Sequence, residues 1–138
     1  MKRLKVNSEV CSGCRICELA CSMGQEGVFD PKKGLIRVEM NRLPDVSTPI
    51  SQIDVPKVCL QCDPAPCAES CPSIAFTRNK DLEISKIDRE LCTACGICAD
   101  ECQYKMIKMN EKGAMKCDLC NGDPVCVRYC PTGAISFS

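Results

Sequence analysis

The chain has 138 residues, 18 Lys and Arg against 18 Asp and Glu, no His and no Trp. This length is typical of one small domain, and the even charge with so few aromatic side chains argues against a nucleic-acid-binding protein, so we expect no nucleic acid partner. The 16 cysteines are far more than an ordinary globular domain contains, and they indicate a scaffold of disulfides or metal.

The N-terminal sequence favours metal over disulfides. The first ten residues, MKRLKVNSEV, contain neither an apolar signal core nor a small-residue cleavage site, so we expect a cytoplasmic protein, in which disulfides are rare. The longest apolar run in the sequence is far too short to cross a bilayer, so we expect no direct membrane span.

The first half of the chain contains one cysteine group and one long irregular segment. A strand is predicted at residues 4–6, a short helix at 16–23, a connection at 24–34 and a half-buried strand at 35–40, where apolar and polar residues alternate. Residues 41–56 contain three prolines, and we expect an extended surface loop there, either a linker or a segment that docks a partner subunit.

The second half repeats a cysteine group followed by a hairpin. Strands are predicted at residues 73–77 and 81–85 around the turn 78–80, then a helix at 97–101. A second hairpin is predicted at 104–109 and 114–116, and a last strand at 134–137. This alternation is that of a duplicated ferredoxin-like α+β module.

The cysteines fall into four groups of the same kind. The groups are Cys11, Cys14, Cys17 and Cys21; Cys59, Cys62, Cys67 and Cys71; Cys92, Cys95, Cys98 and Cys102; and Cys117, Cys120, Cys126 and Cys130. Three closely spaced thiolates can wrap around one 4Fe-4S cube, whereas the fourth, about one helical turn further on, points to a different cube. Sixteen cysteines therefore predict four 4Fe-4S clusters that come in pairs, with no cysteine left over.

Zinc is the alternative metal, because paired CxxC knuckles are common zinc ligands. Zinc sites take two such pairs for each ion, whereas here three cysteines occupy one loop and a fourth follows. Three basic residues lie beside ligand positions, where a positive charge would raise a reduction potential: Arg15, Lys116 and Arg128. Each of them could equally be a solvated surface charge.

Three stretches, CSGCRICELAC, VCLQCDPAPCAESCP and KCDLCNGDPVCVRYCPTGAI, make the chain resemble the four-cluster iron-sulfur subunits of multisubunit oxidoreductases. That family includes subunits of the dimethyl sulfoxide reductase and formate dehydrogenase type. The match looks most like small subunits that serve tungsten-pterin aldehyde oxidoreductases. The resemblance implies two ferredoxin-like modules, the second nested within the first. The outer module would comprise residues 1–56 and 103–138, and the inner one residues 57–102.

Spacing alone leaves the pairing of groups open, and the resemblance implies it. Cluster A would be held by Cys11, Cys14, Cys17 and Cys130; cluster B by Cys117, Cys120, Cys126 and Cys21; cluster C by Cys59, Cys62, Cys67 and Cys102; cluster D by Cys92, Cys95, Cys98 and Cys71. The resemblance also implies an electron path that runs A, B, C, D.

The functional prediction is a non-catalytic electron-transfer subunit of anaerobic metabolism. It would relay single electrons between a catalytic oxidoreductase subunit and a second redox partner. The resemblance implies a tungsten- or molybdenum-pterin aldehyde oxidoreductase as the catalytic subunit. The sequence contains no phosphate-cradling glycine motif, no spare cysteine and no histidine, so nothing in it suggests an active site. The alternative is a free polyferredoxin that diffuses between enzymes.

Overall fold

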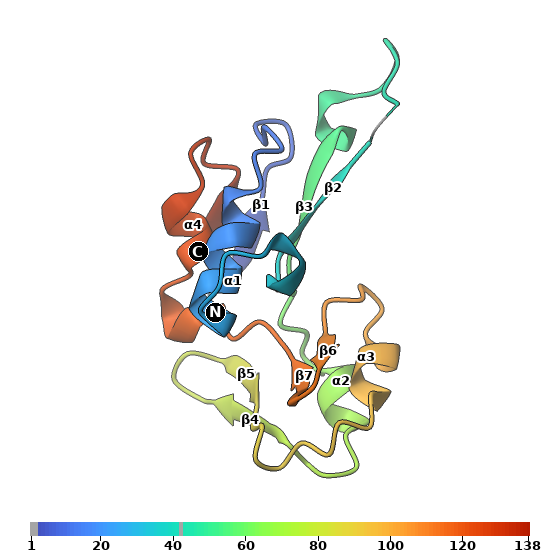
Figure 1. The fold of residues 1–138 in the computed structure, drawn as a ribbon, viewed down its shortest axis with the longest axis vertical. Helices are drawn as coiled ribbons and strands as arrows, with labels where there is room; N and C mark the ends of the chain where they lie inside the picture. The colour runs from blue at the N-terminus through green and yellow to red at the C-terminus, as the bar shows by residue number, and fades with distance from the viewer. Residues whose placement is uncertain (1–2, 42) are drawn as a thin grey trace.

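A computed structural model describes residues 3–41 and 43–138 and contains helices and strands in an α+β arrangement (Figure 1). The helices in these residues are α1 (Ile16–Glu26), α2 (Pro66–Glu69), α3 (Ile97–Glu101) and α4 (Val125–Tyr129). The strands are β1 (Leu4–Val6), β2 (Arg37–Met40), β3 (Asp54–Lys57), β4 (Phe76–Asn79), β5 (Ile84–Ile87), β6 (Lys108–Asn110), β7 (Gly113–Met115) and β8 (Ile135–Phe137).

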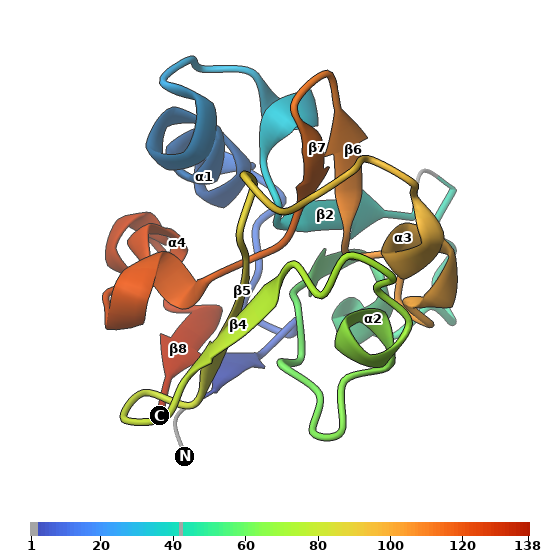
Figure 2. The same ribbon diagram turned by 90° about the horizontal axis from the view of Figure 1, so that it is seen from below.

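The strands form two-stranded antiparallel sheets. The first strand pairs with the last, so that Leu4 lies opposite Phe137 and both described ends of the chain lie on one side of the molecule (Figure 2). The other pairs, β2 with β3, β4 with β5 and β6 with β7, are hairpins of neighbouring strands. The fold is therefore made of short elements joined by long cysteine-bearing loops.

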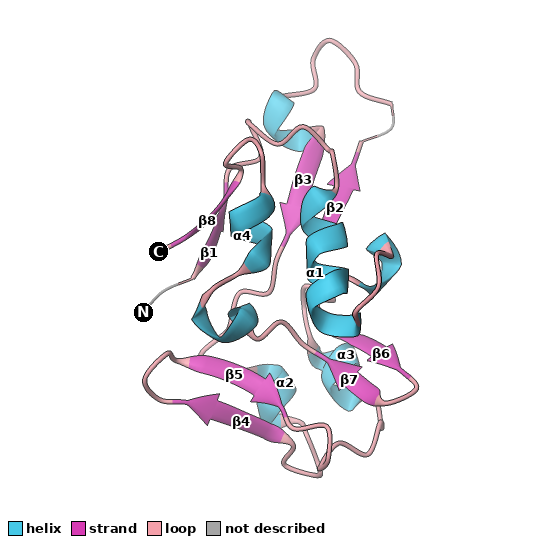
Figure 3. Cartoon of the chain, turned by 60° about the vertical axis from the view of Figure 1, so that its left-hand side comes forward, coloured by secondary structure: helices cyan, strands magenta, loops and turns pink. Residues whose placement is uncertain are grey.

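The helices pack in two pairs. Helix α1 contacts α4, and α2 contacts α3. The α1 and α4 pair lies with β1 and β8 in one part of the molecule, whereas α2 and α3 lie near the β4–β5 and β6–β7 hairpins (Figure 3). The part that contains α1 and α4 thus brings together segments that are far apart in the sequence. The part that contains α2 and α3 brings together segments from the middle of the sequence.

Helix α1 is longer than its prediction of residues 16–23. It continues to Glu26, and Gly27 ends it in a left-handed conformation, φ +72°, from which its N–H donates to the Met23 carbonyl. Glycine adopts this conformation without steric cost, which makes it a common helix terminator. By contrast, the helix at Ile97–Glu101 has the predicted bounds.

The prediction of an extended loop at residues 41–56 is wrong in part. Within it lie a 3-10 turn at Ile50–Gln52 and strand β3, which pairs with β2 to form a hairpin that projects from the molecule (Figure 1). Pro56 lies opposite Val38 in this pair. Proline cannot donate to a ladder, but an edge strand tolerates it, so the prolines did not preclude a strand here.

Both later hairpins begin after their predicted starts. Strand β4 begins at Phe76 where the prediction had residue 73, and β6 begins at Lys108 where the prediction had residue 104. Ile74 and Lys105 have left-handed φ values of +52° and +55°, which interrupt an extended strand. These residues belong to turns that follow a cysteine.

The apolar core surrounds the cysteines. One cluster of buried side chains joins Leu35, Val38, Leu119 and Ile135 to the cysteines of α1 and α4. A smaller cluster joins Ile107 and Ala114 of the β6–β7 region to Cys67 and Cys98. The apolar side chains therefore form a lining around the thiols.

Candidate iron-sulfur sites

Each cysteine loop has a left-handed residue directly before its second cysteine. These residues are Gly13, Gln61, Ala94 and Leu119, with φ values of +71°, +49°, +58° and +53°. A left-handed residue reverses the chain sharply, so that successive thiols of one loop can turn inward. The four groups therefore share a backbone conformation as well as a spacing.

The structure gathers the cysteines into four sets, each with three thiols from one loop and one from another. In set A, the Cys130 thiol lies close enough to Cys11 and Cys17 to raise the pKa of each, as does Cys14. The other three sets each line a cavity. Set B comprises Cys21, Cys117, Cys120 and Cys126; set C comprises Cys59, Cys62, Cys67 and Cys102; set D comprises Cys71, Cys92, Cys95 and Cys98.

The sets adjoin one another in a single order. Cys17 of set A lies near enough to Cys126 of set B to raise its pKa. Across the next boundary, Cys59 of set C acts in the same way on Cys117 of set B. Cys67 of set C acts on Cys98 of set D. The order of neighbours is therefore A, B, C, D.

Exposure differs along this row. Cys14 in set A and Cys95 in set D are exposed, whereas no cysteine of set B or set C is. The third cysteine of each loop is buried, and burial raises the pKa of Cys17 and of Cys126 to about 12. Sets A and D thus each contain one exposed cysteine, whereas the cysteines of sets B and C are buried or half-buried.

The fourth cysteine of each group receives a backbone hydrogen bond at its sulfur. The N–H of Leu35 donates to Cys21 Sγ over 3.1 Å, and the N–H groups of Ala75 and Met106 donate to Cys71 and Cys102 over 3.4 Å each. Backbone hydrogen bonding from Ala134 acts to lower the pKa of Cys130. Such bonds stabilise negative charge on sulfur. The sequence did not reveal them, because their donors have no distinctive side chain.

Two of these sulfurs also lie near a hydroxyl group. Ser73 Oγ is 3.4 Å from Cys71 Sγ, and Thr132 Oγ1 is 3.6 Å from Cys130 Sγ. The Ser73 hydroxyl is the main cause of a lowered pKa for Cys71. Burial raises the pKa of Cys130, but hydrogen bonding from Thr132 and the backbone outweighs it. The signal in the sequence is a hydroxyl residue two positions after a Cys-Pro cysteine.

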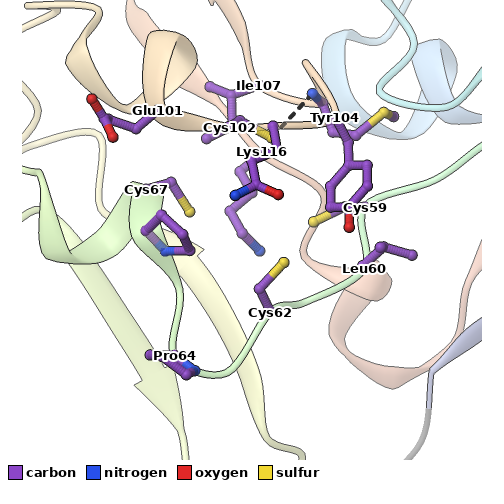
Figure 4. Close-up of a pocket in the computed structure, with 13 residues that line it drawn as sticks. Cys59, Leu60, Cys62, Pro64, Cys67, Glu101, Cys102, Tyr104, Ile107 and Lys116 are labelled. Atoms are coloured by element: carbon purple, nitrogen blue, oxygen red, sulfur yellow. Dashed lines mark hydrogen bonds between the residues drawn. The ribbon is translucent and has the colours of Figure 1, made fainter.

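The cavity of set C also contains a lysine. Lys116 lines it together with the four cysteines, and the volume of the cavity is about 230 Å³. The close-up shows Lys116 among Cys59, Cys62, Cys67 and Cys102, which approach the same space from different sides (Figure 4). Of the other two basic residues singled out in the sequence, Arg15 is half-buried and lies near Glu18, and Arg128 is exposed and lies near Asp123.

The chemistry of each set fits a 4Fe-4S cluster. Every set offers four thiols and no histidine, the donor set that such a cluster takes. All sixteen cysteines are free thiols. Within residues 3–41 and 43–138, no three metal-binding side chains converge closely enough for a single ion. None of the helices described is long and apolar enough to cross a membrane.

The chain matches a family model described as a 4Fe-4S dicluster domain over residues 50–138. This region contains the second, third and fourth cysteine groups, whereas the first group, from Cys11 to Cys21, precedes it.

Several curated proteins are similar over most of the chain. The chain is 35% identical to the polyferredoxin-like subunit of an aliphatic sulfonate oxidoreductase of Pyrococcus furiosus, over 91% of this chain and 69% of that one. It is 31% identical to the electron transport protein HydN of Escherichia coli, over 91% of this chain and 81% of that one. It is 33% identical to the protein NrfC of Escherichia coli, over 95% of this chain and 62% of that one.

Among solved structures, the chain resembles one from the active site complex BamBC of benzoyl coenzyme A reductase. The likeness covers 100% of this chain and 78% of that chain, with a TM-score of 0.51 and 23% identity. At this identity the likeness supports the fold alone.

Proposed function

Because this chain belongs to the 4Fe-4S dicluster domain family, we propose that it relays single electrons through four 4Fe-4S clusters within an oxidoreductase complex. Electrons would pass between a catalytic subunit and a second redox partner. The observation that carries the proposal is the single row of four cysteine sets, of which only the two end sets contain an exposed cysteine.

The proposed ligands are the four sets themselves. Cluster A takes the cysteines of set A, and clusters B, C and D take those of sets B, C and D. For clusters B, C and D this assignment is supported by the cavities that the cysteines line together, and for cluster A by the closeness of Cys130 to Cys11 and Cys17. Each cluster takes one ligand from the loop of another cluster. Clusters A and B therefore depend on each other, and so do clusters C and D.

We propose that clusters A and B belong to an outer module, residues 1–56 and 103–138, and clusters C and D to an inner module, residues 57–102. The pairing of β1 with β8 and the packing of α1 on α4 and of α2 on α3 support this division. The β6–β7 hairpin of the outer stretch packs against cysteines of the inner module, and so ties the two modules together.

We propose a tungsten- or molybdenum-pterin aldehyde oxidoreductase as the catalytic partner. Support comes from the motifs that resemble small subunits of such enzymes, and more generally from a relative that is itself named as an oxidoreductase subunit. A free polyferredoxin would have the same clusters but no stable partner.

The decisive experiment is anaerobic purification of the tagged chain from its own cells at native salt. We expect about 16 iron and 16 sulfide for each chain, from four cubes of four, and a catalytic chain that contains tungsten or molybdenum in the same complex. An iron content of half that value, or zinc in place of iron, would refute the four-cluster assignment. Purification of the fully loaded chain alone would favour the free polyferredoxin.

A further inference from the structure

Lys116 precedes Cys117 of set B in the sequence, but its ammonium group belongs to the surroundings of set C. The side chain is 7% exposed and lines the cavity of set C (Figure 4). Its charge acts on Cys67 of that set, where it opposes the rise in pKa that burial causes. The order of residues along the chain would have assigned this charge to the wrong set.

Three neutral acceptors hold the ammonium group. Lys116 Nζ donates to Gln61 Oε1 over 2.9 Å, to the Ser85 carbonyl over 2.9 Å and to the Cys117 carbonyl over 3.2 Å. Three acceptors match the three N–H donors of a lysine ammonium group. None of the three acceptors carries a negative charge that could neutralise it.

Gln61 fixes the position of the lysine. It is 3% exposed, its Nε2 donates to the Cys117 carbonyl over 2.7 Å, and its Oε1 also accepts from the N–H of Ser85 over 3.2 Å. With both ends of the amide held in this way, the oxygen must face Lys116. The network joins the second cysteine loop, the β4–β5 hairpin and the start of the fourth loop at the boundary between sets B and C.

A fixed, buried charge acts strongly on a redox centre. Four thiolates around a cube leave a net charge of about −2 in its oxidised form and about −3 in its reduced form. A neighbouring cation therefore stabilises the reduced form more, and it does so most effectively where water does not screen it. Arg15 and Arg128 are less suited to this role, because neither is buried and each lies near a carboxylate.

We propose that Lys116 is a positioning residue that raises the reduction potential of cluster C, and not of the sequence-adjacent cluster B. Cluster C would then be the site that retains an electron at the boundary between the two modules. This inference rests on the proposed function, because it requires clusters at sets B and C.

The test is a redox titration, followed by electron paramagnetic resonance, of the iron-loaded protein and of Lys116→Met, Lys116→Gln and Lys116→Arg. Iron and sulfide are measured in every sample. Lys112→Met is the matched control, since it removes an exposed lysine from the turn between β6 and β7. Cys62→Ser and Cys120→Ser identify the signals of clusters C and B.

We expect the neutral variants to shift one midpoint potential to a more negative value, and by more than Lys112→Met does. The signal that moves should be the one that Cys62→Ser alters, and Lys116→Arg should restore most of its potential. A shift of the signal that Cys120→Ser alters, equal shifts in all clusters, or no shift beyond the control would overturn the proposal. So would loss of iron from both neutral variants.

The wild-type iron content separates this proposal from the proposed function. If the wild-type protein lacks four clusters, the proposed function fails as well. If it contains four clusters and none responds to Lys116, only the role of Lys116 fails.

Discussion

Cys17 and Cys21 lie one turn apart on helix α1, both buried, yet they belong to different sets of thiols. Cys17 has Cys14 and Cys130 as neighbours, whereas Cys21 lines a cavity with cysteines of the fourth group. One helix therefore supplies ligands to two proposed clusters, which makes it the shortest covalent link between them.

Replacing Cys21 by Ser should therefore disturb cluster B. It should leave intact cluster A, which the other three cysteines of its group bind. We expect the resonance signal lost in Cys21→Ser to be the one lost in Cys120→Ser, with about four fewer iron atoms for each chain. Met23→Ser, on the exposed part of the same helix, should keep all its iron. A spectrum that matched Cys14→Ser would contradict the assignment.

The ends of the row can be tested with substrate and a chemical reductant. If electrons enter at cluster A, Cys14→Ser should stop reduction of the other clusters by the substrate of the catalytic subunit, while dithionite still reduces them. Cys95→Ser should leave this reduction intact and block delivery to the acceptor. Normal substrate-driven reduction of Cys14→Ser would show that electrons enter elsewhere.

The hydroxyl groups beside the fourth cysteines should tune the two end clusters separately. Once Cys71 is a thiolate it can only accept, so Ser73 must donate, and Ser73→Ala should lower the potential of cluster D. A hydrogen bond of about 1 kcal/mol corresponds to about 40 mV for one electron. Thr132→Val should do the same to cluster A.

The control for these hydroxyl variants is Ser70→Ala. Ser70 lies in the same loop as Ser73, but its hydroxyl donates to the Cys67 carbonyl over 3.1 Å and not to sulfur. A redox titration in which Ser70→Ala shifts cluster D as far as Ser73→Ala would show that the effect is not due to the hydrogen bond to sulfur.

Gly34 should be intolerant of a side chain, because the chain passes closely against α1 there. A Cβ at Gly34 would lie 2.7 Å from the backbone oxygen of Glu18, and the Glu18 carboxylate also accepts from the Val38 N–H over 2.6 Å. Gly34→Ala should destabilise the fold by about 1–3 kcal/mol, measured as a lower temperature at which the visible absorbance of the clusters is lost.

Gly24→Ala is the opposite case in the same part of the chain. Gly24 lies within α1, and the nearest atom to an added Cβ is 3.9 Å away. Alanine is the better helix former by about 0.5–1 kcal/mol, so this variant should lose its clusters at a slightly higher temperature. Equal destabilisation by both substitutions would mean that the close approach at Gly34 is not the cause.

The structural features that were predicted best from the sequence are those that the geometry of a single loop determines. The three-cysteine spacing and the helix at Ile97–Glu101 depend on local geometry, whereas the meeting of Cys11 with Cys130 depends on the tertiary fold and was expected only from a resemblance. Strand starts were predicted too early because nothing in the side chains of Ile74 and Lys105 announces a left-handed backbone. The orientation of Lys116 was likewise invisible, since its neighbour in the sequence is not its neighbour in space.

The pairing of β1 with β8 implies an order in which the proposed sites gain their cysteines during synthesis. Under the proposed assignment, cluster A takes Cys130 and cluster B takes Cys126, so neither site has all its thiols until the fourth cysteine group has been synthesised. The cysteines of sets C and D all lie at or before Cys102, although Ile107 and Ala114 of the later β6–β7 region pack against them. The proposed inner sites therefore have all their thiols before the fourth cysteine group is made, whereas Cys11, Cys14 and Cys17 wait for Cys130.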